Sequence, residues 1–478
     1  MNRSRKVKIL ATLGPASSDK AMIGELHRAG ADLFRINMSH TQPEEMHRLV
    51  GLIREVEAEA ERPIGILVDL QGPKFRIGSF AEGGTPLSRG QHFILDSNAE
   101  PGDASRVFLP HPEIFAMLQP GHRLLLDDGR VQLMTREVFE DHAVATVENG
   151  YRLSDRKGVS FPDTLLLLSS VTRKDRVDLE AALTAGIDWV AMSFIQRPAD
   201  IDEIRALTDG KVGILAKIEK PQAVEHLAEI IEVADALMVA RGDLGVEVPL
   251  EKVPGIQKRI TRGARRAGKP VVVATQMLES MINAPVPTRA EVSDVATAVF
   301  EGADAIMLSA ESAAGAFPVE AVATMDRIAS EVEQDINFRS IINAQRAEPL
   351  ATDADAIAGA VRQIAETLNL AAICCYTGSG TTGIRVSRER PQVPVIALSP
   401  VVATARRLAL GWGLHSVFGE EAEDFDGMVN RACELAVTEG FARPGDRIII
   451  TAGVPVGRPG TTNSLRIAVI REDGKGAA

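Results

Sequence analysis

Two short runs carry the charged residues best suited to chemistry. Lys217-Ile218-Glu219 ends one apolar segment, and Asp243 follows a second apolar segment further along the chain. Carboxylates such as those of Glu219 and Asp243 are hard oxygen ligands that suit Mg²⁺ or Mn²⁺. The ammonium of Lys217 could neutralise a phosphoryl group or a developing oxyanion. The pattern taken alone leaves a simple salt bridge at a strand end equally open.

The elements that must position these residues alternate between strand-like and helical patterns. Eight β-like runs are expected at 7–13, 32–37, 64–69, 189–194, 212–218, 236–240, 270–275 and 305–309. Eight βα units in about 250 residues match the size of an α/β TIM (β/α)8 barrel. Catalytic side chains of such barrels come from the C-terminal ends of the strands, so Lys217, Glu219 and Asp243 should meet at one rim.

Polar residues follow nearly every one of these runs. Besides the residues above, they are Arg35, Asn37, Ser39, His40, Asp69, Ser193, Thr275 and Glu311. Strand ends are often polar because they meet water, so any one of these residues could be there for that reason alone. The turn at Gly242 opens a short helical segment whose backbone N–H groups favour a carboxylate or a phosphate.

Four segments define the expected domains. The barrel takes residues 1–72 and 158–340, and residues 73–157 interrupt it. Glycine pairs and Pro-Gly steps separate short alternating runs in this interruption, which predicts a small β domain. Strand-like runs at 371–376, 395–398 and 447–451 lie among helical patterns, so residues 341–478 are expected to form a C-terminal α/β domain.

Composition limits the class of function. The 478 residues are 45% hydrophobic and 25% charged, as in an ordinary globular protein. The formal net charge of −12 disfavours a nucleic-acid partner. Three cysteines without zinc-site spacing suggest a reducing, cytoplasmic location. Because apolar runs stay shorter than about 18 residues, we expect no membrane span.

Several longer motifs carry a resemblance to a known family. They are TLGPAS (12–17), FRINMSH (34–40), DLQGPK (69–74), AKIE (216–219), VARGDLG (239–245), ATQMLESM (274–281) and PTRAEVSD (287–294). With these motifs the chain resembles the pyruvate kinases over essentially its whole length. A final strand pair around 451–463 also resembles that family. The family architecture, a TIM barrel with an inserted β-domain lid and a C-terminal regulatory domain, agrees with the layout above. The resemblance thus implies a small β-barrel lid domain at 73–157 and a regulatory role for the α/β domain at 341–478.

The resemblance implies a glycolytic kinase that transfers a phosphoryl group from phosphoenolpyruvate to ADP, giving pyruvate and ATP. It implies Mg²⁺ or Mn²⁺ on Glu219 and Asp243, with Lys217, Arg35 and Thr275 as catalytic residues. The substrate-binding residues would be Arg35, Ala240, Arg241, Gly242, Asp243 and Thr275. The nucleotide-binding residues would be His40, Arg76 and Asp127. A homotetramer is the oligomer that the resemblance implies.

Lys74 departs from a common family pattern. Many pyruvate kinases carry Glu at this position and require K⁺, held by residues that match Asn37, Ser39 and Asp69, in a region that includes Leu70. The ammonium of Lys74 could supply this positive charge covalently, so we expect no K⁺ requirement. The alternative is that Lys74 is a solvated residue at the hinge of the lid.

A second departure concerns regulation. One loop has the small residues typical of a site for the phosphate of an allosteric effector. It is formed by Thr377, Ser379, Gly380, Thr381 and Thr382. The basic residues that often accompany such a loop are absent from it, so the loop could equally be the start of a helix.

Two other functions remain open at this stage. A metal-dependent barrel lyase acting on pyruvate or oxaloacetate could use the same carboxylates without a nucleotide-covering lid. A non-catalytic metabolite sensor would have no need to retain Lys217.

Overall fold

The fold is known from a computed structural model that describes residues 3–346, 348–420, 422, 424–454 and 462–477. Its centre is a closed parallel barrel of eight strands in the order β1-β16-β15-β14-β13-β12-β3-β2. The strands are β1 (Lys8–Leu13), β2 (Leu33–Asn37), β3 (Gly65–Asp69), β12 (Trp189–Met192), β13 (Gly213–Ile218), β14 (Ala236–Ala240), β15 (Val271–Ala274) and β16 (Ala305–Leu308). All eight predicted barrel strands are therefore confirmed.

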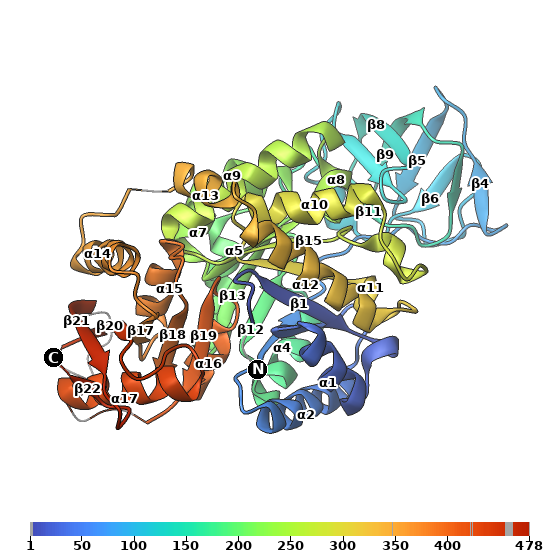
Figure 1. Cartoon of the computed structure of the whole chain (residues 1–478). Helices are drawn as coiled ribbons and strands as arrows, with labels where there is room; N and C mark the ends of the chain where they lie inside the picture. Colours follow the sequence, from blue (N-terminus) through green and yellow to red (C-terminus); the bar gives the residue numbers. More distant parts are fainter. Residues whose placement is uncertain (1–2, 347, 421, 423, 455–461, 478) are drawn as a thin grey trace.

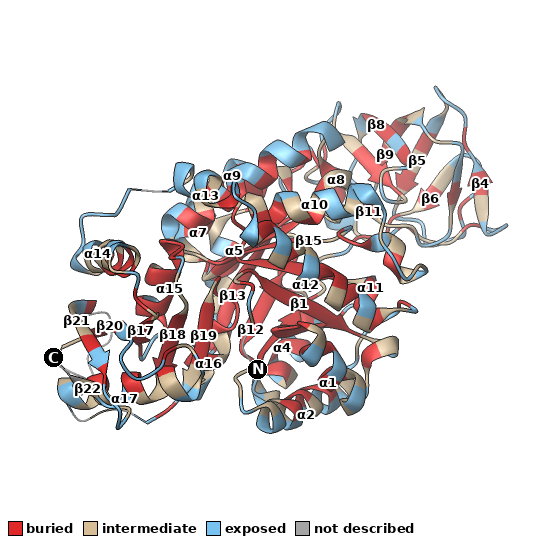
Figure 2. Cartoon of the chain, viewed as in Figure 1, coloured by how far each residue is buried: buried red, intermediate tan, exposed pale blue. Residues whose placement is uncertain are grey.

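Helices cover the outside of the barrel, so its strands are buried on both faces and read as continuous apolar runs. These helices are α1 (Lys20–Ala29), α2 (Pro43–Ala60), α4 (Arg173–Ala185), α5 (Pro198–Thr208), α6 (Pro221–Glu225), α7 (Leu227–Val233), α8 (Arg241–Glu247), α9 (Val253–Ala267), α10 (Arg289–Phe300), α11 (Ala310–Ala313), α12 (Pro318–Gln334) and α13 (Phe338–Ala344). Figure 2 shows the red, buried strands inside and the pale-blue, exposed helix faces outside. Local sequence fixes several helix starts: at α10, Thr288 and Glu291 form a capping box.

The inserted segment folds as a separate β domain at one end of the barrel (Figure 1). Its elements are β4 (Gly84–Pro86), β5 (His92–Asp96), β6 (Arg106–Phe108), α3 (Pro112–Phe115), β7 (Arg123–Leu126), β8 (Val131–Val138), β9 (His142–Asn149), β10 (Arg152–Ser154) and β11 (Val159–Ser160). Where the resemblance implied a small barrel, the strands form a six-stranded sheet, β11-β7-β8-β9-β5-β6, and a two-stranded sheet, β10-β4. Phe161 and Leu166 pack in the core of this domain, which thus extends past residue 157.

The C-terminal domain lies against the other end of the barrel (Figure 1). Its sheet has the order β19-β18-β17-β20-β21-β22. Its elements are α14 (Asp353–Thr367), β17 (Ala372–Tyr376), α15 (Thr381–Arg388), β18 (Val395–Ser399), α16 (Val402–Leu408), β19 (Leu414–Phe418), α17 (Phe425–Thr438), β20 (Arg447–Gly453), β21 (Thr462–Ile470) and β22 (Gly476–Ala477). The predicted α/β domain is confirmed. The expected final strand pair is β20 and β21, which are antiparallel, although 455–461 lie outside the described residues.

Three 3-10 turns complete the path of the chain: Pro15–Ser17, Leu250–Lys252 and Glu279–Ile282. Within the described part of the chain, no helix is both long and apolar enough to cross a membrane.

Candidate active site

Lys217 is the centre of a charged cluster at the C-terminal rim of the barrel. It lies near the end of β13, and its Nζ is 2.8 Å from Oε1 of Glu219 and 3.3 Å from Oδ1 of Asp69. The ammonium also donates a hydrogen bond of 2.7 Å to Oγ of Ser193. One hydrogen bond and two ion pairs thus hold the ammonium at a defined point of the rim.

Arg35 is fixed on the opposite side of Asp69. Its Nε donates to Oδ2 of Asp69 at 2.8 Å, its Nη2 lies 2.7 Å from the same oxygen, and its Nη1 donates to Oγ1 of Thr12 at 3.1 Å. Burial alone would raise the pKa of Asp69, but the positive charges of Lys217 and Arg35 outweigh burial and lower that pKa. Asp69 is therefore an ionised anchor between two cations.

Glu219 is the carboxylate best prepared for a metal. It is fully buried, and its Oε2 accepts a hydrogen bond of 2.8 Å from the backbone N–H of Phe194. Its Oε1 faces Lys217 and accepts no hydrogen bond from any described residue. Burial raises the pKa of Glu219 to about 7; the charge of Asp243 acts in the same direction, whereas Lys217 opposes it. A divalent cation would satisfy the bare oxygen and relieve this cost of burial.

Asp243 comes from the first turn of α8, which begins directly after β14. The backbone N–H of Gly242 donates a 2.8 Å hydrogen bond to Oγ1 of Thr275, whose φ of +69° is unusual for a β-branched residue. Arg241 points away from the rim: its Nη1 donates to Asp294 at 2.7 Å and its Nη2 to the carbonyl of Thr275 at 2.7 Å. The Gly242 N–H and the Thr275 hydroxyl, both expected to receive a substrate carboxylate, here bond to each other.

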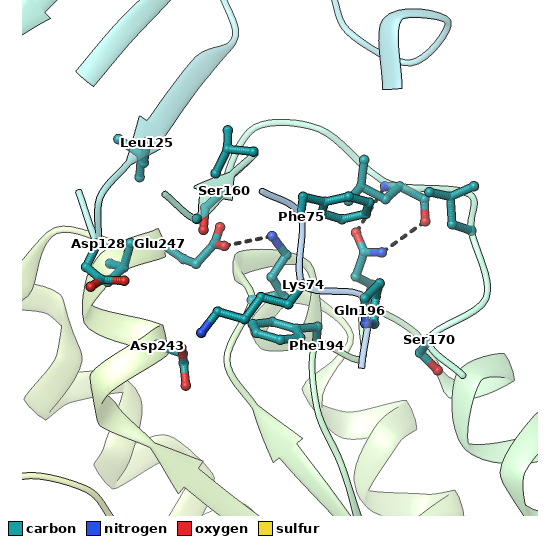
Figure 3. Close-up of a pocket in the computed structure, with 17 residues that line it drawn as sticks. Lys74, Phe75, Leu125, Asp128, Ser160, Ser170, Phe194, Gln196, Asp243 and Glu247 are labelled. Carbon is teal, nitrogen blue, oxygen red and sulfur yellow. Dashed lines mark hydrogen bonds and ion pairs between the residues drawn. The ribbon is translucent and has the colours of Figure 1, made fainter. Parts of the chain in front are cut away.

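A cleft separates the rim from the inserted domain (Figure 3). Lys74 is exposed and reaches into this cleft, with its ammonium pointing toward Asp243. Behind it, Lys220 and Glu247 form a buried ion pair of 2.8 Å. Asp128 lines the same cleft from the inserted domain. The cleft therefore carries charged groups from both domains, as a lid over an ionic substrate requires.

The expected nucleotide residues lie apart from this cluster. His40 and Arg76 are exposed, and Arg76 donates from Nη1 to the carbonyl of Arg156 at 3.1 Å. Asp127 is paired with Lys157 at 2.7 Å within the inserted domain. None of these three side chains forms a hydrogen bond or an ion pair with Lys217, whose partners are Asp69, Glu219 and Ser193.

The expected effector loop forms the start of α15. Oγ1 of Thr377 accepts from the backbone N–H of Gly380 at 2.9 Å, and Gly380 is the left-handed residue before the helix. Ser379 and Thr381 share a hydrogen bond of 3.0 Å, and Thr382 shares one of 2.6 Å with Thr462. The helix-start alternative thus describes the local structure correctly, and it leaves an anion-binding role open.

Sequence reasoning gave no role to several residues of the site. Ser193 was noted only as a strand end, and Thr12, Lys220 and Glu247 were not singled out. For Ser193 and Thr12 the signal was their place at the ends of barrel strands. For Lys220 it was a charge that directly follows a buried strand.

Taken together, the rim and the lid define a class. A TIM barrel that gathers an ammonium, a guanidinium and two carboxylates at its catalytic end, beneath an inserted domain, is an enzyme built to enclose an anionic substrate away from water.

Comparison with known proteins identifies the family. A model described as pyruvate kinase, barrel domain, matches residues 4–322, and one described as pyruvate kinase, alpha/beta domain, matches residues 355–468. The chain is 59% identical to a pyruvate kinase of Methylorubrum extorquens over 99% of both chains, and 45% identical to one of Agrobacterium vitis over 98% of both. The crystal structure of a pyruvate kinase from Cryptosporidium parvum superimposes with a TM-score of 0.92 at 31% identity, covering 98% of this chain and 96% of that one.

The chain belongs to the pyruvate kinase family, and it is an enzyme of that kind. This outcome favours a kinase over the barrel lyase and the non-catalytic sensor that the sequence had left open.

Proposed function

We propose that the enzyme transfers a phosphoryl group from phosphoenolpyruvate to ADP, giving pyruvate and ATP in the glycolytic direction. The observation that carries this proposal is the fixed Lys217 ammonium between Glu219, Asp69 and Ser193 at the rim. Phosphoryl transfer is catalysed mainly by positioning and by neutralising charge as it moves, and this ammonium is preorganised for that task.

Arg35 is suited to hold the transferred phosphate. Its Nε–H and one N–H of Nη1 donate to Asp69 and Thr12, and Nη2 forms an ion pair with Asp69. The other N–H groups of Nη1 and Nη2 would bind a phosphate through two parallel hydrogen bonds. Asp69 and Thr12 thus orient the Arg35 guanidinium, and the substrate phosphate would bind to its Nη1 and Nη2 edge.

Glu219 and Asp243 would hold the divalent metal, Mg²⁺ or Mn²⁺. In the described part of the chain no group of three or more His, Cys, Asp or Glu side chains is placed for a metal, which suits an ion that is completed by substrate oxygens. When bound, the ion would supply Lewis-acid polarisation and a template for phosphate and enolate oxygens. The Lys217 ammonium, 2.8 Å from Oε1 of Glu219, would neutralise charge on the phosphoryl group beside the ion.

The remaining substrate contacts follow from the turn after β14. The Gly242 N–H donates to the Thr275 hydroxyl, and this bond would open to receive the substrate carboxylate. Backbone groups of Ala240, Arg241 and Asp243 in the same turn would complete the binding of the substrate. His40, Arg76 and Asp127 would face the nucleotide when the inserted domain closes over the rim. Closure excludes water, which would otherwise hydrolyse the phosphoryl group.

We also propose that the enzyme needs no K⁺. Asp69 is already neutralised by Lys217 and Arg35, and the Leu70 carbonyl accepts from Oγ of Ser193 at 2.8 Å. Oδ1 of Asn37 accepts from the Ser39 N–H at 3.1 Å. With these oxygens engaged and the Lys74 ammonium in the cleft, the substrate phosphate has a covalent source of positive charge. A cytoplasmic homotetramer regulated by a phosphorylated effector at the Thr377–Thr382 loop completes the proposal.

A substrate comparison tests this function. Purified enzyme with Mg²⁺ should form pyruvate from phosphoenolpyruvate and ADP. Pyruvate formation is measured by coupling it to lactate dehydrogenase. It should not release pyruvate from oxaloacetate at a comparable rate. Faster turnover of oxaloacetate would assign the site to the lyase instead.

A further inference from the structure

The loop that joins β12 to α5, residues 193–197, contacts the catalytic rim at its first residues. Oγ of Ser193 accepts the 2.7 Å hydrogen bond from the Lys217 ammonium. The backbone N–H of Phe194 donates the 2.8 Å hydrogen bond that orients Oε2 of Glu219. The start of the β12–α5 loop therefore positions both the ammonium and the buried carboxylate of the site.

The other end of this loop holds the inserted domain. Gln196 is only 6% exposed, and its amide group forms two hydrogen bonds with the backbone of Leu166, drawn as dashed lines at Gln196 in Figure 3. Its Oε1 accepts from the Leu166 N–H at 3.1 Å, and its Nε2 donates to the Leu166 carbonyl at 2.9 Å. One side chain thus satisfies both backbone polar groups of a residue 30 positions away.

Leu166 belongs to the linker that returns the chain from the inserted domain to the barrel. This linker, residues 161–171, runs between β11 and α4. Leu166 packs in the core of the inserted domain, whereas Leu165 and Leu167 on either side of it are exposed. A movement of the inserted domain therefore moves Leu166, and the Gln196 amide is the group on the barrel that holds its backbone.

The linker that enters the inserted domain contacts the same loop. Oγ of Ser193 donates to the carbonyl of Leu70 at 2.8 Å. Gly72 packs so closely on the loop that a Cβ atom at Gly72 would lie 2.9 Å from the Ser193 carbonyl oxygen. The β12–α5 loop is therefore in contact with both linkers of the inserted domain and with both charged groups of the rim.

The backbone of the loop is strained between these contacts. Phe194 has a φ of +58°, a left-handed conformation that is uncommon for a bulky residue. Such a conformation persists only where the surrounding contacts hold it. On the rim side the contact is with Glu219, and on the other side Asp200 accepts from the Gln196 N–H at 2.8 Å while the Gln196 amide holds Leu166.

We propose that Gln196 is a positioning residue that couples the inserted domain to the geometry of the rim. Its bonds to Leu166 hold the loop in the strained form in which Phe194 orients Glu219. A metal ion and substrate at Glu219 favour the same form of the loop, so by reciprocity they hold the linker in place when the inserted domain closes. This role rests on the proposed function, because the coupling serves that reaction.

Gln196→Met tests the role in turnover, because it removes both hydrogen bonds at nearly the same side-chain length. We expect turnover to fall about tenfold and the Mg²⁺ concentration for half-maximal rate to rise at least about threefold. Gln257→Met is the matched control, since Gln257 is 5% exposed and its Nε2 donates to Glu301 at 2.9 Å. It should lower the temperature of unfolding yet leave turnover and the Mg²⁺ titration within about twofold.

Hydrogen exchange of the 161–171 backbone, measured by mass spectrometry, tests the coupling without turnover. In the unmodified chain, Mg²⁺ with phosphoenolpyruvate and no ADP should slow exchange of this linker at least about threefold. In Gln196→Met the linker should exchange faster and no longer respond to these ligands. The β8–β9 hairpin of the inserted domain is the internal reference, and its exchange should be the same in both proteins.

Three results would overturn the proposal. They are normal turnover and Mg²⁺ dependence of Gln196→Met, an equal loss of turnover in Gln257→Met, and ligand-induced slowing of the linker that survives in Gln196→Met. If Gln196→Met does not fold, Gln196→Glu repeats the test, because it keeps the side-chain length and an acceptor for the Leu166 N–H but loses the Nε2 donor. An unmodified enzyme that forms no pyruvate would refute the proposed function instead, while slowing of its linker by the ligands, lost in Gln196→Met, would still support the role of Gln196.

Discussion

Replacing Lys217 by Met removes the cation on which the rim is organised. In the folded protein its side chain is 10% exposed and faces two carboxylates that are 0% and 1% exposed, those of Glu219 and Asp69. Asp69 keeps Arg35, but Glu219 retains only the hydrogen bond from Phe194. Loss of one partner of a buried ion pair typically costs about 3–5 kcal/mol, so we expect the barrel to lose about 3 kcal/mol of unfolding free energy. Turnover should fall by about 10²–10³, the effect of losing one preorganised electrostatic group.

A double variant separates the two effects. Lys217→Met with Glu219→Gln removes the uncompensated carboxylate, so the unfolding free energy should recover by about 2 kcal/mol. Turnover should stay at least as low as in the single variant, because neither the ammonium nor the metal ligand is restored. Lys220→Met breaks a similarly buried pair with Glu247 and controls for stability alone. It should lower stability but cost less than about tenfold in turnover.

The assays are urea denaturation, followed by circular dichroism, and initial rates of pyruvate formation at saturating substrate. Near-normal turnover of Lys217→Met would remove Lys217 from the mechanism. A double variant that regains turnover together with stability would also remove it, since activity would then only have followed the amount of folded protein.

Three further predictions concern the metal, the monovalent cation and pH. Glu219→Gln and Asp243→Asn should each raise the Mg²⁺ concentration for half-maximal rate at least about tenfold; an unchanged Mg²⁺ titration in both would contradict the ligand assignment. The unmodified enzyme should work without K⁺ at constant ionic strength held by a bulky organic cation, whereas Lys74→Glu should become K⁺-stimulated; strong K⁺ activation of the unmodified enzyme would falsify the role of Lys74. His27 is buried, and burial lowers its pKa from 6.5 to about 4, so the unfolded chain takes up a proton first and stability should fall as pH drops from about 6.5 through 4. The loss should be on the order of 3 kcal/mol, and His27→Gln should flatten it; an equal slope in urea melts of both proteins would refute this.

The barrel and its rim were predictable because parallel strands place all their C-terminal ends at one edge. Apolar runs followed by Arg35, Asp69, Lys217 and Glu219 therefore had to bring these side chains together. What the pattern does not contain is the partner of each charge. That Asp69 lies between Lys217 and Arg35, and that Ser193 accepts a hydrogen bond from Lys217, depends on barrel register and rotamers.

Other features of the structure were not predicted from the sequence, for identifiable reasons. Strand β19 (Leu414–Phe418) was missed because His415 and Ser416 interrupt its apolar pattern, although both are buried and His415 pairs with Glu439. Strand β11 has only two residues, too short for a period to be read, so the inserted domain was expected to end before it. The hydrogen bond between Gly242 and Thr275 depends on a left-handed backbone at Thr275. This conformation is not predicted for a β-branched residue.

The most direct test of the enzyme is a simultaneous measurement of pyruvate and ATP from phosphoenolpyruvate, ADP and Mg²⁺. If the rim transfers the phosphoryl group to nucleotide, the two products should appear in equal amounts. Omitting ADP should stop pyruvate formation, because no other acceptor reaches the phosphoryl group under the closed inserted domain. Pyruvate released at the same rate without ADP, or without matching ATP, would contradict phosphoryl transfer to the nucleotide.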